Sequence, residues 1–174
     1  MPQPGLVQVY TGAGKGKTTA ATGLALRALG QGLRVLLVRF LKSADSISGE
    51  VAILETLPGI EIITAGIGII GQRPPPALVT ESVRQAFARG RARVLSGEID
   101  LAIFDEGNNA LHRGDLALQE VLQLIAERPA HVELLFTGRH APDELAARAD
   151  LVTRMEAVRH PYSEGIPARA GIEY

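Results

Sequence analysis

The chain has 174 residues, a formal net charge of −1 and no cysteine. Its length is typical of one domain (1–174), and its balanced charge predicts no general attraction to nucleic acid or to an acidic membrane surface. The missing cysteines exclude disulfides and thiolate sites, and no apolar run approaches the ~20 residues of a membrane span or resembles a signal peptide, so we expect a cytoplasmic protein.

Short apolar runs alternate along the chain with longer amphipathic segments. We predict strands, aliphatic on both faces because both faces should be covered, at 6–10, 34–40, 60–64, 101–105, 132–137 and 151–155. We predict helices after the first strand up to Gly30, over 77–96, over 115–128 with Asp115 as a first-turn acid, and from Asp143. This alternation predicts an α/β fold with a mostly parallel sheet, helices on both faces, and ligands bound beyond the carboxyl ends of the strands.

Two segments lack such periodicity. Residues 66–76 are rich in Gly and Pro and are expected to form a loop, which lies where a lid over the substrate belongs. Residues 157–174 are an irregular tail punctuated by Gly and Pro.

The first predicted strand runs into GAGKGKTT, residues 12–19. A phosphate chain needs inward-pointing backbone N–H groups, a cation and the N-terminus of a helix, and this segment supplies all three. Lys17 can reach the phosphates, and the Thr18 hydroxyl can bind Mg²⁺. A glycine-rich turn without a ligand would explain the glycines but not the lysines at 15 and 17. The segment therefore predicts a P-loop NTPase-like (RecA-like) fold, and its nucleotide-binding candidates are Gly12, Ala13, Gly14, Lys15, Gly16, Lys17, Thr18 and Thr19.

Two further clusters follow predicted strands. Asp105 and Glu106 end an apolar strand and are candidate metal ligands, although the spacing does not show which of them contacts the metal. By themselves they would be interpreted as two solvated acids, but their position after a phosphate loop favours metal binding. Arg139 follows the strand 132–137 and can stabilise negative charge on a leaving phosphate, whereas we interpret His140 as a polar loop residue.

Nearly the whole chain, from about residue 5 onward, resembles the P-loop type of ATP:corrinoid adenosyltransferases. The resemblance rests on TGAGKGKTTAATGLALRALGQGLRV, RFLKS, FDEGNNAL, LLFTGRHAP, ADLVTRME and RHPYSEGIPARAGIEY. The second lysine of the phosphate loop, Lys15, and the C-terminal segment are its most distinctive parts.

The resemblance implies a specific reaction. A corrinoid reduced to Co(I) attacks C5′ of ATP, a cobalt–carbon bond forms, and inorganic triphosphate leaves. It further implies that Lys15 and Lys17 bind phosphates, that Thr18 and Glu106 hold Mg²⁺ (or Mn²⁺), and that Arg139 and Lys42 belong to the nucleotide site. The nucleotide would lie in the P-loop in reversed sense, the tail would lie near the substrates, and the protein would be a homodimer that can receive electrons from a donor protein.

The match is weakest at the lid loop. The family places a Phe and a Trp there to displace the lower ligand of cobalt, but this chain has Ile69 and Gly71 at those positions and no Trp anywhere. Ile69 and Ile70 could form a smaller apolar lid, or they could be core residues that hold the loop down. Ala13 stands where the family often has Asn or Asp. A diverged P-loop ATPase or kinase, and a nucleotide-binding regulatory module, therefore remain alternative functions.

Overall fold

The computed structural model describes residues 4–43, 48–69 and 74–172. The described chain forms one six-stranded sheet in the order β3-β2-β4-β5-β1-β6, and every neighbouring pair is parallel. Its strands are β1 (Val7–Thr11), β2 (Val35–Ser43), β3 (Ile60–Gly66), β4 (Leu101–Asp105), β5 (Glu133–Thr137) and β6 (Leu151–Arg154). The helices are α1 (Lys17–Gly30), α2 (Gly49–Leu54), α3 (Pro76–Leu95), α4 (Gly107–His112), α5 (Leu118–Glu127) and α6 (Asp143–Arg148), and a 3-10 turn covers Pro161–Glu164. The predicted α/β fold, with a parallel sheet of the P-loop NTPase-like type, is confirmed.

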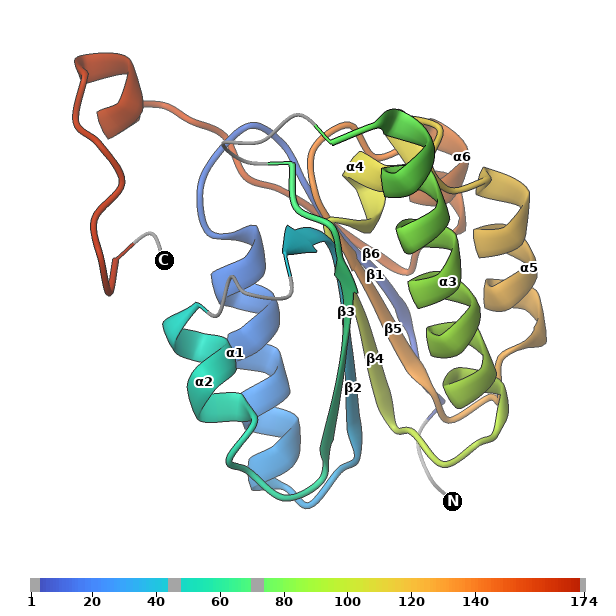
Figure 1. The fold of residues 1–174 in the computed structure, drawn as a ribbon. Helices are drawn as coiled ribbons and strands as arrows, with labels where there is room; N and C mark the ends of the chain where they lie inside the picture. The colour runs from blue at the N-terminus through green and yellow to red at the C-terminus, as the bar shows by residue number, and fades with distance from the viewer. Residues whose placement is uncertain (1–3, 44–47, 70–73, 173–174) are drawn as a thin grey trace.

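Helices cover both faces of the sheet, with α1 and α2 on one side and α3, α4, α5 and α6 on the other (Figure 1). The α1 face is lined with small and branched aliphatic residues, so α1 packs closely through its alanines. The opposite face carries a row of aromatic rings in which Phe104 lies between Phe40 and Phe136, with ring centroids 6.3 and 5.1 Å away. Because Phe87 also lies against Phe104, with centroids 5.7 Å apart, all four Phe of the chain pack together on this face.

Helix α3 lies unusually close to the sheet at Gly90. A Cβ on Gly90 would lie 2.8 Å from Cγ2 of Val38 and 3.2 Å from Cε1 of Phe104. The missing side chain therefore allows α3 to pack directly on β2 and β4.

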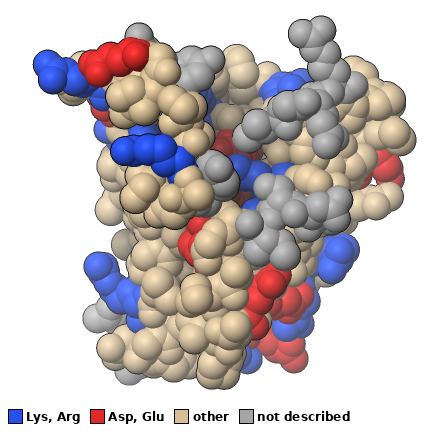
Figure 2. Space-filling model, turned by 60° about the vertical axis from the view of Figure 1, so that its left-hand side comes forward, with Lys and Arg blue, Asp and Glu red and all other residues tan. Residues whose placement is uncertain are grey.

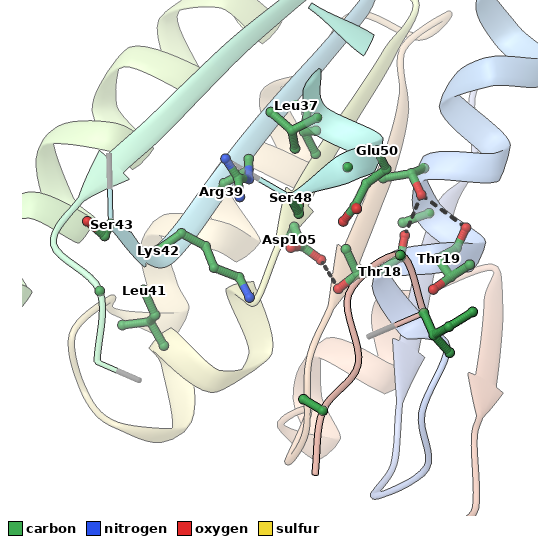
Figure 3. Close-up of a pocket in the computed structure, with 18 residues that line it drawn as sticks. Thr18, Thr19, Leu37, Arg39, Leu41, Lys42, Ser43, Ser48, Glu50 and Asp105 are labelled. Atoms are coloured by element: carbon green, nitrogen blue, oxygen red, sulfur yellow. Dashed lines mark hydrogen bonds between the residues drawn. The ribbon is translucent and has the colours of Figure 1, made fainter. Parts of the chain in front are cut away.

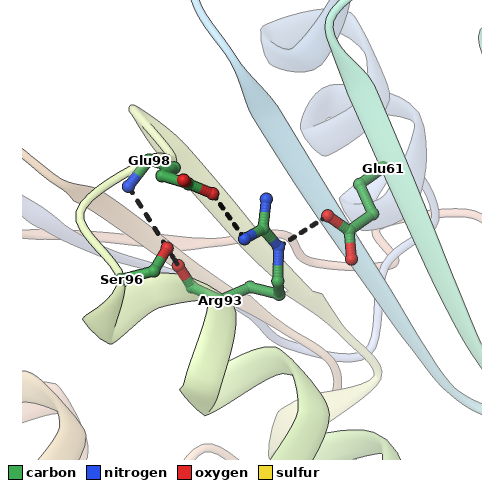
Figure 4. A network of polar contacts seen from close by, with 4 residues as sticks. All are labelled: Glu61, Arg93, Ser96 and Glu98. Carbon is green, nitrogen blue, oxygen red and sulfur yellow. Dashed lines mark hydrogen bonds and ion pairs between the residues drawn. The ribbon is translucent and has the colours of Figure 1, made fainter.

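Arg93, in the last turn of α3, connects the C-terminal end of this helix to the sheet. Its guanidinium donates to Glu61 at the start of β3 (2.8 Å) and to Glu98 before β4 (2.7 Å), as Figure 4 shows. All three side chains are partly exposed. Such surface pairs add little stability, so the network mainly orients the α3–β4 connection.

Three expectations differ from the structure. All four residues of β6 are exposed, because β6 is an edge strand without a covering helix, so the prediction of a strand buried on both faces was wrong there. Helix α5 begins at Leu118 and not at Asp115, whose buried carboxylate instead accepts hydrogen bonds from Thr80 (2.7 Å) and Arg113 (2.7 Å). The short helices α2 and α4 were not predicted, since six residues are too few to show a helical period.

None of the helices in the described part of the chain combines the length and apolar character that crossing a bilayer requires.

Candidate functional site

The phosphate loop joins the end of β1 to the start of α1. Gly12 and Gly16 have φ angles of 99° and 110°, in the left-handed region that favours glycine. Gly12 also lies against the chain that follows β6, where a Cβ would be 2.3 Å from the Met155 carbonyl oxygen, and the Gly14 N–H donates to that oxygen (2.8 Å). The glycines therefore serve both the turn and a close backbone approach.

The two lysines of the loop have different surroundings. Lys17 Nζ is partly buried and donates to the carbonyls of Gly12 (2.8 Å) and Gly14 (2.6 Å), which holds its charge at the loop. Burial lowers the pKa of Lys17, an effect that Glu106 opposes. Lys15 is exposed, and its Nζ donates to the Ile172 carbonyl of the C-terminal tail (2.9 Å).

The predicted acids lie beside the first turn of α1. Asp105 is buried, and its Oδ1 accepts hydrogen bonds from the hydroxyls of Thr18 (2.9 Å) and Thr137 (2.7 Å). The Glu106 N–H donates to Thr137 Oγ1 (3.0 Å), so one hydroxyl supports both acids. Burial, followed by the charge of Asp105, raises the pKa of Glu106, while Lys42, Lys17 and Arg139 act to lower it. The structure thus brings together residues that the sequence places almost 90 positions apart.

Two amides of α4 connect these acids to the loop after β5. Asn109 donates through Nδ2 to the Glu106 carboxylate and accepts through Oδ1 from the Arg139 backbone N–H (2.6 Å). The fully buried Asn108 donates to the carbonyls of Tyr10 (3.2 Å) and Gly138 (3.1 Å) and so joins the ends of β1 and β5. Neither amide was predicted from the sequence to have a role, although both follow the two acids with only Gly107 between.

A cavity of about 800 Å³ opens beside this cluster, on the α1 and α2 side of the sheet (Figure 3). Thr18, Asp105 and Lys42 line it, and Ala168, Gly171 and Ile172 of the tail line another part. Figure 2 shows basic and acidic atoms within a hollow on this side of the molecule. Three tail residues thus line the same cavity as Thr18, and the placement of the tail near the substrates stays a prediction.

Arg39 also lines this cavity, although no role was predicted for it from the sequence. It is 6% exposed, and Cα register places it between Thr64 of β3 and Asp105 of β4. Its charge inside the otherwise apolar run VLLVRF (35–40) was the signal that could have identified it.

Only part of the lid loop can be compared with its prediction. Ile69 packs against the hydrophobic core on the α3 side, together with Ile67, which agrees with the alternative that it holds the loop down. Gly68 lines the cavity. Ile70 and residues 71–73 lie outside the described residues, so the lid assignment stays a prediction.

His140 is exposed in the loop after β5, as expected of a polar loop residue, and its ring stacks on His112 with centroids 4.3 Å apart. Within the described chain, no group of three or more His, Cys, Asp or Glu side chains could hold a metal by itself. The hydroxyl and carboxylates of Thr18, Asp105 and Glu106 form a hard-oxygen set. Such a set suits Mg²⁺, which usually takes one or two carboxylates and completes its shell with phosphates and water.

Comparison with known proteins agrees with this geometry. The family model for ATP:corrinoid adenosyltransferase BtuR/CobO/CobP matches residues 3–174. The chain is 32% identical over 170 residues to the corrinoid adenosyltransferase of Escherichia coli K12, covering 98% of this chain and 86% of that protein. It is 34% identical over 171 residues to the corrinoid adenosyltransferase of Pseudomonas aeruginosa, covering 98% and 84%. It is also 33% identical to an uncharacterized protein, all2391, of Nostoc, covering 90% of this chain but 45% of that protein. The phosphate loop, the paired acids and the near-complete coverage place this chain in the ATP:corrinoid adenosyltransferase family BtuR/CobO/CobP, as a corrinoid adenosyltransferase.

Proposed function

We propose that this site transfers the 5′-deoxyadenosyl group of metal-bound ATP to the Co(I) centre of a corrinoid and releases inorganic triphosphate. The observation that carries the proposal is that the charges of Lys17, Glu106 and Arg139 act on one another. They do so beside Thr18 and Asp105, which line a cavity of about 800 Å³. This arrangement places positive charge where a polyphosphate would depart and leaves space for the rest of the substrates.

The phosphate loop would hold the triphosphate of ATP. Its backbone N–H groups and the N-terminus of α1 favour an anion, and Lys15 and Lys17 supply the cations. Lys17 would exchange the Gly12 and Gly14 carbonyls for phosphate oxygens. The nucleotide would lie in reversed sense, with its adenosine directed toward the cavity that Lys42 lines.

Thr18 and Glu106, with Asp105 behind them, would hold Mg²⁺ or Mn²⁺. Because Asp105 Oδ1 already accepts bonds from the Thr18 and Thr137 hydroxyls, we assign Asp105 to orienting Thr18 and Glu106 to the metal itself. When bound, the cation would neutralise charge on the phosphates and so make triphosphate a better leaving group.

The nucleophile belongs to the substrate, so no protein base is required. Co(I) supplies the electron pair of the new cobalt–carbon bond, and the pair of the broken C5′–O bond leaves with triphosphate. The protein holds C5′ in line with cobalt and stabilises the departing charge, chiefly through Lys17 and Arg139. Because Co(I) is strongly reducing, we also expect a donor protein to supply the electron.

The decisive experiment incubates the protein with ATP, Mg²⁺ and a chemically reduced Co(I) corrinoid under anaerobic conditions. We expect the absorption spectrum of an alkylcobalt product and one triphosphate per corrinoid, and little of either from Lys17→Ala. Formation of ADP or orthophosphate without alkylated cobalt would contradict the proposal and favour an ATPase or kinase. Nucleotide binding without any turnover would favour a regulatory module.

A further inference from the structure

Asn109 lies between two groups that the proposed reaction uses. It belongs to the short helix α4, whereas Glu106 follows β4 and Arg139 follows β5. Its Nδ2 donates to Glu106 Oε2, and its Oδ1 accepts the Arg139 N–H at 2.6 Å. One side chain therefore links the end of one strand to the loop after the next.

The carboxamide is chemically suited to this link. It carries a donor and an acceptor on one planar group, so it can bind a carboxylate and a backbone N–H at the same time. An Asp could not donate to Glu106 at neutral pH, and a Leu of similar size could bind neither partner.

Glu106 depends on such support because of its backbone. Its φ of 61° lies in the left-handed region, which an L-residue other than Asn, Asp or Gly seldom adopts. Thr137 holds its N–H, and Asn109 holds its carboxylate through Oε2. Engaging one oxygen of the carboxylate also fixes the direction of the other.

We propose that Asn109 is a positioning residue that orients Glu106 for the metal and keeps the Arg139 loop at a set distance from it. This inference rests on the proposed function, because it assigns Glu106 to a metal and Arg139 to the departing triphosphate. Asn109 touches neither substrate and acts through these two residues.

The test compares Asn109→Leu with Gln123→Leu. Gln123 makes the same type of amide–carboxylate bond, to Glu127 at 2.7 Å, but on the exposed surface of α5. ATP affinity is measured by calorimetry with and without Mn²⁺, and the ratio of the two affinities is the readout. A residue that only stabilises the fold would lower the unfolding midpoint and leave this ratio unchanged.

We expect Asn109→Leu to lower the ratio by about 10-fold, the lower end of the range typical of residues that support metal ligands. We expect kcat to fall by a similar factor, with a smaller change in KM for ATP. The inhibition constant of inorganic triphosphate should rise, because the Arg139 loop loses its anchor. Gln123→Leu should stay within about twofold of the wild type in each measurement. Should Asn109→Leu fold poorly by circular dichroism, Asn109→Ala removes the same two bonds with less volume.

The double variant Glu106→Ala/Asn109→Leu separates the two proposals. If Asn109 acts through Glu106, the double variant has the same ratio of ATP affinities with and without Mn²⁺ as Glu106→Ala alone. A wild type and a Glu106→Ala variant with equal ratios would overturn the metal assignment of the proposed function. A second outcome would overturn only the role of Asn109. In it, Glu106→Ala lowers the ratio of ATP affinities with and without Mn²⁺, whereas Asn109→Leu leaves that ratio equal to the wild-type value.

Discussion

Thr137 is the residue on which the local geometry of the acid pair depends most. Its side chain is fully buried, and its hydroxyl donates to Asp105 and accepts the Glu106 N–H. A buried polar group that loses its partner retains the cost of desolvation, so the three groups support one another.

We predict that Thr137→Val destabilises the protein by about 1–3 kcal/mol, because it preserves the shape but leaves a buried carboxylate and a buried N–H with fewer partners. Urea unfolding monitored by circular dichroism gives the value. Thr56→Val, which removes a hydroxyl bond to the Ile53 carbonyl on the surface, is the control and should change little. If Thr137→Val and the wild type were equally stable, the hydrogen bonds of the Thr137 hydroxyl to Asp105 and to the Glu106 N–H would not stabilise the protein.

Lys17 is the second residue for which we predict the effect of a substitution. Lys17→Ala should weaken ATP binding by about 10-fold or more, because it removes a partly desolvated cation that can reach the phosphates. Titration calorimetry measures the affinity, and Arg84→Ala on the exposed side of α3 serves as a charge-matched control. An unchanged affinity would argue against the phosphate-loop assignment.

At the scale of elements, α3 and α1 pack differently on the two faces of the sheet. Gly90 of α3 faces Val38 and Phe104 closely, whereas Gly23 of α1 is exposed and an added Cβ would meet nothing within 4 Å. A Gly→Ala substitution therefore tests tight packing together with helix propensity at Gly90, and helix propensity alone at Gly23.

We predict that Gly90→Ala destabilises the protein by about 1–2 kcal/mol, because overpacking outweighs the gain of about 1 kcal/mol in helix propensity. Gly23→Ala should instead stabilise it by about 0.5–1 kcal/mol, since only the propensity gain applies there. Denaturant unfolding of both variants measures the difference. Opposite signs support the close packing of α3, and a stabilised Gly90→Ala would contradict it.

The Arg93 network predicts a pH dependence. Its hydrogen bond holds the pKa of Glu98 below the usual 4.5, so the ionised pair favours the folded state above that pH. This contribution is lost as the pH falls through the lowered pKa of the folded state. Arg93→Met should therefore be less stable than the wild type at pH 7 by a small margin, and the margin should shrink below pH 4. A margin that grows on acidification would contradict this assignment.

At the scale of the whole molecule, residues from both ends of the chain surround one cavity. The tail residues Ala168, Gly171 and Ile172 line it together with Thr18 of the first turn of α1, and the Ile172 carbonyl accepts a hydrogen bond from Lys15. The described part of the tail, residues 157–172, contains no strand and is largely exposed where its burial is given, so we expect its contacts to matter more at the site than for stability.

We predict that deletion of residues 165–174 leaves the unfolding midpoint nearly unchanged but raises KM for ATP or for the corrinoid several-fold. Thermal unfolding and steady-state kinetics on the full chain and the deletion provide the comparison. Val158→Ser, which changes a tail residue that is 96% exposed and does not line the cavity, should behave as the wild type does. Unchanged kinetics after the deletion would show that the tail does not shape the site.

The sequence by itself determined the features that depend on neighbours along the chain. The phosphate loop, the acids at the end of β4 and the alternation of strands and helices are local patterns, because a turn, a strand end or a helix face is made by adjacent residues. The roles of these residues in binding remain predictions from the sequence that the geometry supports.

Only the tertiary structure decided which distant residues support the site. Thr137 reaches Glu106 across 31 positions and Asn109 reaches Arg139 across 30, and both pairs meet because β4 and β5 are neighbours in the sheet. The tertiary structure also decided that Ile69, which is partly buried, packs against the core. It likewise decided that β6 is an exposed edge strand, which its apolar pattern could not show. Contacts between strand ends depend on strand order, and strand order is a property of the whole chain that no local pattern contains.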